Sequence, residues 1–267
     1  MGEFSLLTLN TFGLPLFLGW RRLGRLMKQL DQYGAAVLCF QEIQQNAYVP
    51  LLERGLPDYQ YYAYESNWFA PKGGLFTATR EPMEQSGFIA YENRGRPFSA
   101  GFADWALNKG VLMTQVQVKG RHIVVMNTHL HANYAGNWTS DHSMSRIQRD
   151  QVRHLAQLIR EQPGDALVVA CGDFNFPRGT FLYDELIAQA NLIDPLADDP
   201  RPTYRPFPLI PKEKWSLPID FCFVRLPAWQ GLQVTGDIIE IQDDTKLFPM
   251  QRFLTDHNAL TLKVNWD

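Results

Sequence analysis

Polar residues of chemically useful types recur where the apolar runs of this sequence begin or end. They are Asn10 in LTLNTFG, Glu42 in CFQEI, His129 in MNTHLHA, Asp173 and Asn175 in CGDFN, Asp220 in LPIDFCF, and Asp256 with His257 in LTDHNAL. Taken singly, an Asn or Asp at a strand end is usually a turn or cap residue. Taken together, these amides, carboxylates and imidazoles are the groups needed to hold a hard cation and to direct an in-line attack on phosphorus.

These residue types favour one metal chemistry and one way of activating water. Carboxylate and amide oxygens suit Mg²⁺, with Mn²⁺ as an alternative, and they exclude a zinc-type site. An imidazole beside a carboxylate can act as a general base at neutral pH, because the carboxylate fixes the tautomer and stabilises the imidazolium.

The elements that must position these residues alternate between short apolar runs and helical patterns. Strands are predicted at 4–10, 35–42, 59–64, 74–80, 86–92, 110–118, 122–130, 166–174, 219–226 and 257–265, and helices at 21–32, 47–54, 143–161 and 180–191. Several strands are apolar on both faces, which favours an α/β fold of two packed sheets with helices outside. The segment 194–218 contains seven prolines and is expected to form a long ordered loop.

Composition bounds the class of protein. The chain has 267 residues, 45% of them hydrophobic and 20% charged, so it can bury a core of native size. No internal repeat or linker is visible, and one domain over residues 1–267 is expected. The net charge of −3 weighs against a general DNA-binding protein, because no basic field would gather nucleic acid.

The cysteines and the amino-terminal segment leave the compartment open. Cys39, Cys171 and Cys222 lie in apolar runs and are expected to be buried free thiols. The uncharged run from Ser5 to Trp20 is too short and too interrupted to span a bilayer. It also lacks the features of a signal peptide, so a soluble chain is expected, with its localisation unknown.

The ordered motifs LNTFG, QE, NTHL, GDFN, ID and DH resemble the endonuclease/exonuclease/phosphatase superfamily, whose DNase I-like fold is a four-layered α/β sandwich. The resemblance covers the chain from Asn10 to His257. It implies a catalytic Mg²⁺ held mainly by Glu42, with Asn10 and Asp256 close by. It further implies that His257 is the general base and is paired with Asp220. Asp173 would orient the nucleophile, Asn175 and His129 would hold phosphate oxygens, and His129 could also assist the leaving group.

Finer motifs resemble the neutral sphingomyelinases within this superfamily. LNTFGLP, GDFN and THLHANY carry this resemblance, together with GFADWALNKG. By analogy, Asp104 and Lys109 are candidates for the substrate side of the site, and the alternative is a surface ion pair. The loop 14–20, followed by Arg21 and Arg22, is the best candidate for contact with a membrane. The expected substrate is therefore a phospholipid headgroup ester, reached by peripheral membrane contact, and no obligate protein partner is indicated.

Two other functions compete with the lipid phosphodiesterase. A DNA or RNA endonuclease or exonuclease is compatible with the superfamily, but the acidic balance weakens it. The basic residues Arg21, Arg22, Arg25 and Lys28 fall on one predicted helix and are expected to form a solvated face rather than a nucleic-acid groove. A non-enzymatic scaffold is disfavoured, because every catalytic position holds the residue type that catalysis requires.

Overall fold

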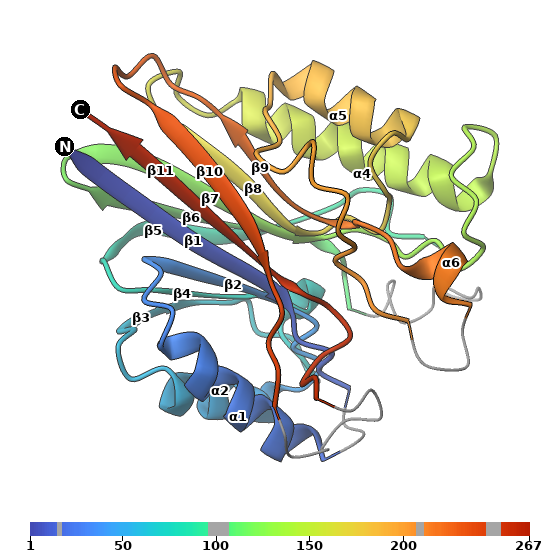
Figure 1. Cartoon of the computed structure of the whole chain (residues 1–267), viewed down its shortest axis with the longest axis horizontal. Helices are drawn as coiled ribbons and strands as arrows, with labels where there is room; N and C mark the ends of the chain where they lie inside the picture. The colour runs from blue at the N-terminus through green and yellow to red at the C-terminus, as the bar shows by residue number, and fades with distance from the viewer. Residues whose placement is uncertain (15–17, 96–106, 207–210, 244–251) are drawn as a thin grey trace.

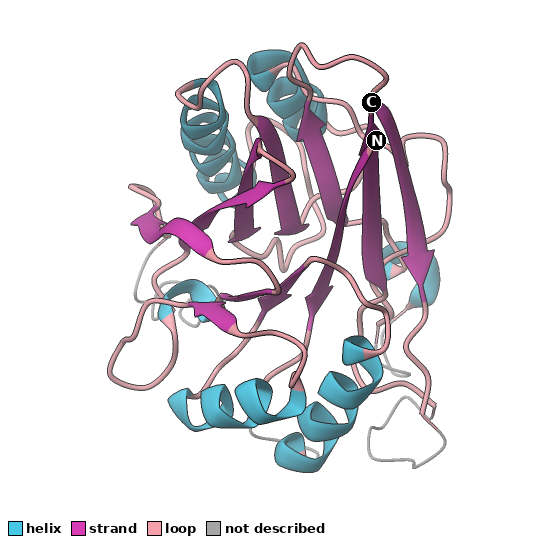
Figure 2. Cartoon of the chain, turned by 90° about the vertical axis from the view of Figure 1, so that its left-hand side faces the viewer, coloured by secondary structure: helices cyan, strands magenta, loops and turns pink. Residues whose placement is uncertain are grey.

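Two mixed sheets pack face to face in the computed structural model, which describes residues 1–14, 18–95, 107–206, 211–243 and 252–267 (Figures 1 and 2). The first sheet has the order β10 (Gln233–Ile239), β11 (Ala259–Trp266), β1 (Gly2–Asn10), β2 (Val37–Gln41), β4 (Phe76–Thr79), β3 (Tyr61–Ala63). The second has the order β5 (Met83–Ala90), β6 (Gly110–Val118), β7 (Arg121–His129), β8 (Leu167–Asp173), β9 (Asp220–Arg225).

Helices cover the outer face of each sheet and complete four layers (Figure 1). The first sheet is covered by α1 (Gly19–Asp31) and α2 (Val49–Gly55), and the second by α4 (Ser143–Arg160) and α5 (Phe181–Ala190). The large apolar clusters follow these layers, because one lies beneath each pair of helices and one lies between the sheets. The predicted four-layered α/β sandwich is confirmed.

The apolar spacing of α1 explains how it packs. Leu23, Leu26, Met27 and Leu30 recur at helical spacing and are fully buried against the first sheet. Burial of each of these side chains contributes about 1.5–3 kcal/mol to folding. This face fixes the helix, and the opposite face is left to polar residues and to Trp20.

Most predicted elements occur with ends shifted by a few residues, and some predictions were wrong. The strand β10 was not predicted, and β5 begins at Met83 instead of residue 86. The segment 194–218 contains the short helix α6 (Lys212–Trp215), although no element was expected there. Part of that segment, 207–210, lies outside the described residues, as do 15–17 of the predicted membrane loop.

Arg22 is a further correction, because it is buried and not part of a solvated face. Its guanidinium donates to the carbonyls of Thr11 at 2.7 Å and Leu254 at 2.5 Å, and also to the carbonyl of Phe12. Burial lowers the pKa of Arg22 to about 10, so the side chain stays charged at neutral pH. Arg22 therefore ties the loop after β1 to the segment before Asp256.

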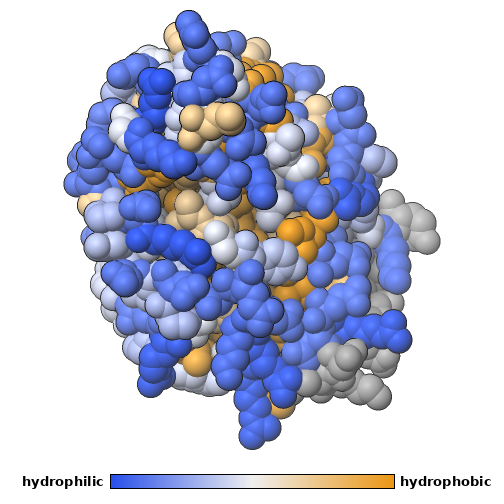
Figure 3. Space-filling view, turned by 60° about the vertical axis from the view of Figure 1, so that its left-hand side comes forward, coloured by the Kyte–Doolittle hydropathy of each residue, from blue (hydrophilic) through white to orange (hydrophobic). Residues whose placement is uncertain are grey.

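The three cysteines lie in the core, as the apolar runs around them predict. Cys39, Cys171 and Cys222 are buried and unpaired by disulfides. Within the described ranges, no helix combines the length and the apolar character needed to cross a bilayer. The side of the molecule that carries the β3 and β5 edges is mostly hydrophilic, with hydrophobic residues in a band across its middle (Figure 3).

Candidate active site

The predicted site residues meet at one rim of the sandwich because each sheet contains a parallel pair of strands. Asn10 ends β1 beside Gln41 of the parallel strand β2, and Glu42 follows directly. In the second sheet, His129 at the end of β7 pairs with Asp173 at the end of β8. The chain termini lie at the other end of β1 and β11 (Figure 1).

Asp220 and His257 reach the same rim from strands that run in the opposite direction. Asp220 begins β9 directly opposite Asp173, because β8 and β9 are antiparallel. His257 precedes β11 and forms an isolated bridge with Tyr204. Two buried threonines fix these positions: Thr203 Oγ1 accepts the backbone N–H of Asp220 at 3.0 Å, and Thr255 Oγ1 donates to the carbonyl of Asn10 at 2.7 Å.

Glycines in two of the motifs allow the backbone to approach the site residues. A Cβ on Gly13 would lie 1.7 Å from the carbonyl oxygen of Glu42, and one on Gly172 would lie 1.9 Å from that of Thr128. Glu42 itself has φ 61°, a conformation that costs a non-glycine residue on the order of 1 kcal/mol and is typical of functional sites. The glycines of LNTFG and GDFN thus serve the backbone geometry around the carboxylates.

His257 and Asp220 form the closest pair of ionisable groups at the rim. His257 Nδ1 lies 2.8 Å from Asp220 Oδ2, and both side chains are buried. Burial alone would lower the pKa of His257, but Asp220, Asp256 and Asp173 together raise it to about 10. The bond to Asp220 fixes the proton on Nδ1 and leaves Nε2 facing the cleft, 3.8 Å from Asp173 Oδ2 and 4.0 Å from Asp256 Oδ1.

Asp173 lies at the centre of the cluster. Its Oδ2 accepts from Asn10 Nδ2 at 2.9 Å and lies 3.4 Å from His129 Nε2, while its Oδ1 accepts the backbone N–H of Asn175 at 3.0 Å. Burial and the neighbouring Asp220 raise the pKa of Asp173 to about 7, against the lowering effect of His257. Asp173 therefore fixes the positions of the surrounding groups, and its own pKa lies near neutral pH.

Asn10 holds two carboxylates together through its amide nitrogen. Nδ2 donates to Glu42 Oε1 at 3.1 Å as well as to Asp173, and Oδ1 accepts the backbone N–H of Phe12 at 3.0 Å. In this arrangement the amide oxygen faces away from Glu42. Ligation of a cation through that oxygen requires the amide plane to turn.

The donor set fits a hard divalent cation. Glu42, His129 and Asp173 offer ligand atoms within 4.8 Å of one another, and Asp173, Asp220 and His257 form a second such group. Burial, followed by the charge of Glu42, raises the pKa of Asp256 to about 6, against the lowering effect of His257. Buried carboxylates crowded in this way gain most from a cation held by oxygen ligands.

His129 and Lys109 are two further predicted site residues, and both side chains are buried. Burial, and then the charges of Lys109, His257 and His131, lower the pKa of His129 well below 6.5, so its imidazole is neutral at neutral pH. Lys109 is fully buried, so it does not belong to a surface ion pair. The other substrate-side candidate, Asp104, lies outside the described residues.

The cluster opens into a cleft of about 590 Å³ with an aromatic wall. Tyr134, Trp138, Tyr204 and Trp215 line it, together with Glu42, His129, Asp173, Asn175, Asp256 and His257. Trp138 is fixed by its indole N–H, which donates to the carbonyl of Asn175 at 3.0 Å, and its ring meets Trp215 edge-on at 6.5 Å. Sequence reasoning did not find Trp138, although it lies four residues after the end of THLHANY and is the next aromatic residue of the chain.

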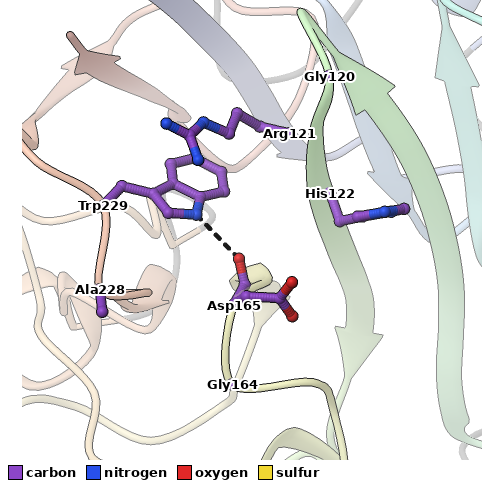
Figure 4. A pocket seen from close by; sticks show the side chains of 7 residues that line it. All are labelled: Gly120, Arg121, His122, Gly164, Asp165, Ala228 and Trp229. Carbon is purple, nitrogen blue, oxygen red and sulfur yellow. Dashed lines mark hydrogen bonds between the residues drawn. The ribbon is translucent and has the colours of Figure 1, made fainter.

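A second hollow, of about 290 Å³, lies at the other end of the strands (Figure 4). It is bounded by the turn before β7, the turn before β8 and the segment after β9. Arg121 lies over the ring of Trp229, whose indole N–H donates to the carbonyl of Asp165 at 2.9 Å (Figure 4). None of the predicted site residues that the structure describes lines this hollow.

Comparison with known proteins agrees with the geometry. A model of the endonuclease/exonuclease/phosphatase family matches residues 7–257. The chain belongs to this family. Members of the family depend on divalent metals, and the family name covers endonucleases, exonucleases and phosphatases, which are hydrolases of phosphoric esters.

The related sequences include lipid enzymes. A putative neutral sphingomyelinase of Drosophila melanogaster is 25% identical over 98% of this chain and 60% of its own length. An inositol phosphosphingolipid phospholipase C of Saccharomyces cerevisiae is 30% identical over 45% of this chain and 25% of its own length. The chain thus spans about 60% of the fly relative.

Solved structures share the fold. A Staphylococcus aureus beta toxin variant with bound magnesium ions has a TM-score of 0.75 at 15% identity, over 98% of this chain and 99% of its own. TDP2 of D. rerio in complex with a single-strand DNA product has a TM-score of 0.71 at 21% identity, over the same shares of the two chains. At these identities the likeness establishes the DNase I-like fold alone.

Proposed function

We propose that this protein is a Mg²⁺-dependent phosphodiesterase that hydrolyses a phospholipid headgroup ester by in-line attack of water. The observation that carries the proposal is the contact of His257 Nδ1 with Asp220 at 2.8 Å. It leaves His257 Nε2 facing a cleft that is lined by the carboxylates of Glu42, Asp173 and Asp256. Family membership supports phosphoric ester hydrolysis, and the lipid substrate is supported by the sphingomyelinase and inositol phosphosphingolipid relatives.

The residues of the chain divide the chemistry between them. His257 takes the proton of the attacking water at Nε2, because Asp220 holds the other ring nitrogen as a donor. Asp173 orients that water, and Asn175 and His129 hold the phosphate oxygens on which charge develops. The neutral imidazole of His129 can also donate a hydrogen bond from its ring N–H to the departing oxygen, without transfer of its proton.

Glu42 and Asp256, with Asn10 after rotation of its amide, would hold the Mg²⁺, and Mn²⁺ suits the same oxygen ligands. When bound, the cation would stabilise the negative charge that develops on the phosphate. It would also offset the charge of the carboxylates that raise the pKa of His257. His257 can then be neutral at physiological pH, as a general base must be.

The test is release of phosphocholine from sphingomyelin in mixed micelles, with Mg²⁺ and with EDTA, beside nicking of supercoiled plasmid by the same preparation. We expect metal-dependent lipid cleavage without nicking. His257→Ala and Asp220→Asn should each lower kcat by about 10²-fold or more with little change in KM. His122→Ala, an exposed imidazole at the opposite rim, is the matched control.

Each alternative result has a definite meaning. A kcat of His257→Ala close to that of the wild type would contradict the mechanism. Nicking without lipid cleavage would assign the chain to the nucleases of the family, and full activity in EDTA would remove the metal from the proposal.

A further inference from the structure

Large apolar side chains stand in solvent at the start of α1 and in the nearby loop 65–70. Leu18 is 58% exposed, Trp20 47% and Trp68 87%. Single exposed apolar residues are ordinary, but a group of them marks a surface that meets an apolar partner.

Contacts join these residues into one surface. The ring of Trp20 meets Tyr48 edge-on at 5.2 Å. Two residues earlier, Asn46 donates its backbone N–H to the carbonyl of Phe69 at 3.0 Å and its side chain to the carbonyl of Asn67 at 2.6 Å. The loop that carries Trp68 is therefore attached to the segment on which Trp20 packs.

This surface borders the cleft. Leu14 and Gln44 line the cleft, while Gln45 lines a hollow shared with Leu18 and Trp20. The carbonyl of Leu14 lies 3.1 Å from where a Cβ on Gly19 would be, so the start of α1 stays close to the cleft wall. Tyr134, which also lines the cleft, is 49% exposed.

The outward face of α1 adds positive charge. Arg21, Arg25 and Lys28 lie at helical spacing on that face and surround one hollow with Trp20. Arg22 points inward instead. Arg25, whose side chain is half exposed, forms an ion pair at 3.4 Å with the largely buried side chain of Asp243, and no acidic residue occurs in the first turn of α1.

We propose that these residues, Leu18, Trp20, Trp68, Arg21, Arg25 and Lys28, form a docking lip that binds an anionic membrane surface and brings the cleft to its lipid. Trp and Leu side chains enter the headgroup region, while the cations meet lipid phosphates. The inference rests on the proposed function, because a phospholipid substrate must be reached at a membrane.

A nucleic-acid partner fits this surface less well. The chain carries a net charge of −3, and the lip has three cations beside a leucine and two tryptophans. Phosphate contacts would make no use of the exposed Leu18, whereas a lipid surface takes up apolar side chains and attracts cations together.

The test is co-sedimentation of the full chain with phosphatidylcholine vesicles, with and without phosphatidylserine. We expect binding that is stronger with phosphatidylserine and weaker at high salt. The pair Trp20→Ala with Trp68→Ala, and the pair Arg21→Glu with Lys28→Glu, should each lower the partition coefficient by about tenfold or more. The matched control is Leu226→Ala with Lys119→Glu, an exposed leucine and lysine at the opposite rim, which should bind like wild type.

Hydrolysis assays separate this proposal from the catalytic one. The ratio of vesicle-lipid hydrolysis to hydrolysis of soluble bis(4-nitrophenyl) phosphate should fall in the lip variants and stay constant in the control. Soluble-substrate activity without vesicle binding, or lip variants that bind oligonucleotides less and vesicles equally well, would overturn the docking lip. Vesicle binding by the lip without lipid cleavage would support the lip and overturn the proposed function.

Discussion

Arg22 shows how a single buried charge holds the site together. Its guanidinium donates to carbonyls of the loop after β1 and of the segment that leads to Asp256. Removing it leaves these carbonyls buried without a charged donor, so Arg22→Ala should lower the free energy of unfolding by about 3 kcal/mol. Arg22→Lys should recover only part of this, because an ammonium cannot reproduce the planar fork.

Urea denaturation would measure both variants, with Arg54→Ala, an exposed arginine at the end of α2, as the control. The control should stay within about 0.5 kcal/mol of wild type. Equal free energies of unfolding for Arg22→Ala and Arg54→Ala would show that the buried Arg22 contributes no more to stability than an exposed arginine.

The sequence could identify the chemistry-bearing residues but not their supports. Asn10, Glu42, His129 and Asp173 stand at the ends of recognisable strands, so their meeting at one rim was predictable. Thr203 and Thr255 were not, because a lone threonine carries no pattern that reveals its hydrogen bonds. Arg22 was assigned wrongly for a related reason: four basic residues in eight positions suggest a solvated face, and only tertiary contacts turn one of them inward.

At the scale of elements, the two sheets are joined beneath the site by a buried amide network. Asn127 of β7 donates to the carbonyls of Phe40 in β2 and Phe76 in β4, each at 3.1 Å. Its oxygen accepts from Gln41 Nε2 at 2.7 Å, one residue before Glu42. These bonds fix the position of the strand that carries His129 relative to the strand that carries Glu42.

Asn127→Ala should therefore lower the free energy of unfolding by about 2–3 kcal/mol, because it leaves several buried polar groups without partners. Gln117→Ala, on the neighbouring strand β6 with its side chain exposed, should change stability by less than about 0.5 kcal/mol. Thermal denaturation followed by circular dichroism would compare the two, and a loss no larger for Asn127→Ala than for Gln117→Ala would contradict the network.

The contact between α4 and α5 gives a prediction on pH. Glu185 accepts from Arg149 Nε at 2.7 Å and Arg153 Nε at 2.6 Å. Burial works against ionisation, but the two arginines outweigh it and lower the pKa of Glu185 below 4.5. Because the folded pKa is lowered, this stabilisation is present above pH 4.5 and is lost as the pH falls through the folded pKa.

Glu185→Gln should thus cost up to about 1 kcal/mol at pH 7, with the difference from wild type shrinking as the pH falls below 4.5. Urea denaturation at a series of pH values would measure it. A difference that is constant over the whole range would exclude the charge of Glu185 as its cause.

The limits of element prediction have a physical origin as well. The strand β10 reads QVTGDII, and its glycine and aspartate are residue types that strands disfavour. It pairs only with β11 at the edge of its sheet, so pairing and not its own sequence makes it a strand. Central strands such as β8, apolar on both faces, were located within one residue at each end.

At the scale of the whole molecule, the carboxylates gathered at the rim for the proposed chemistry lower the stability of the folded chain. Glu42, Asp173, Asp220 and Asp256 gather at one end of the sandwich, and burial with mutual repulsion raises the pKa of Asp173 to about 7 and that of Asp256 to about 6. Unfolding relieves this repulsion. A cation held there should therefore stabilise the folded chain as well as serve catalysis.

A thermal-shift titration tests this coupling without any assay of activity. At a hundredfold excess over its Kd, Mg²⁺ should add about 2.7 kcal/mol to the free energy of unfolding, which corresponds to roughly 5–10 °C in Tm for a chain of this size. In Glu42→Gln the shift should largely disappear, while its Tm without metal should be at least that of wild type, because one repelling charge is gone and the amide oxygen still accepts from Asn10. The matched control is Glu185→Gln, which removes a carboxylate away from the rim and should keep the full shift. An equal Mg²⁺ shift in Glu42→Gln and Glu185→Gln would place the cation elsewhere on the molecule.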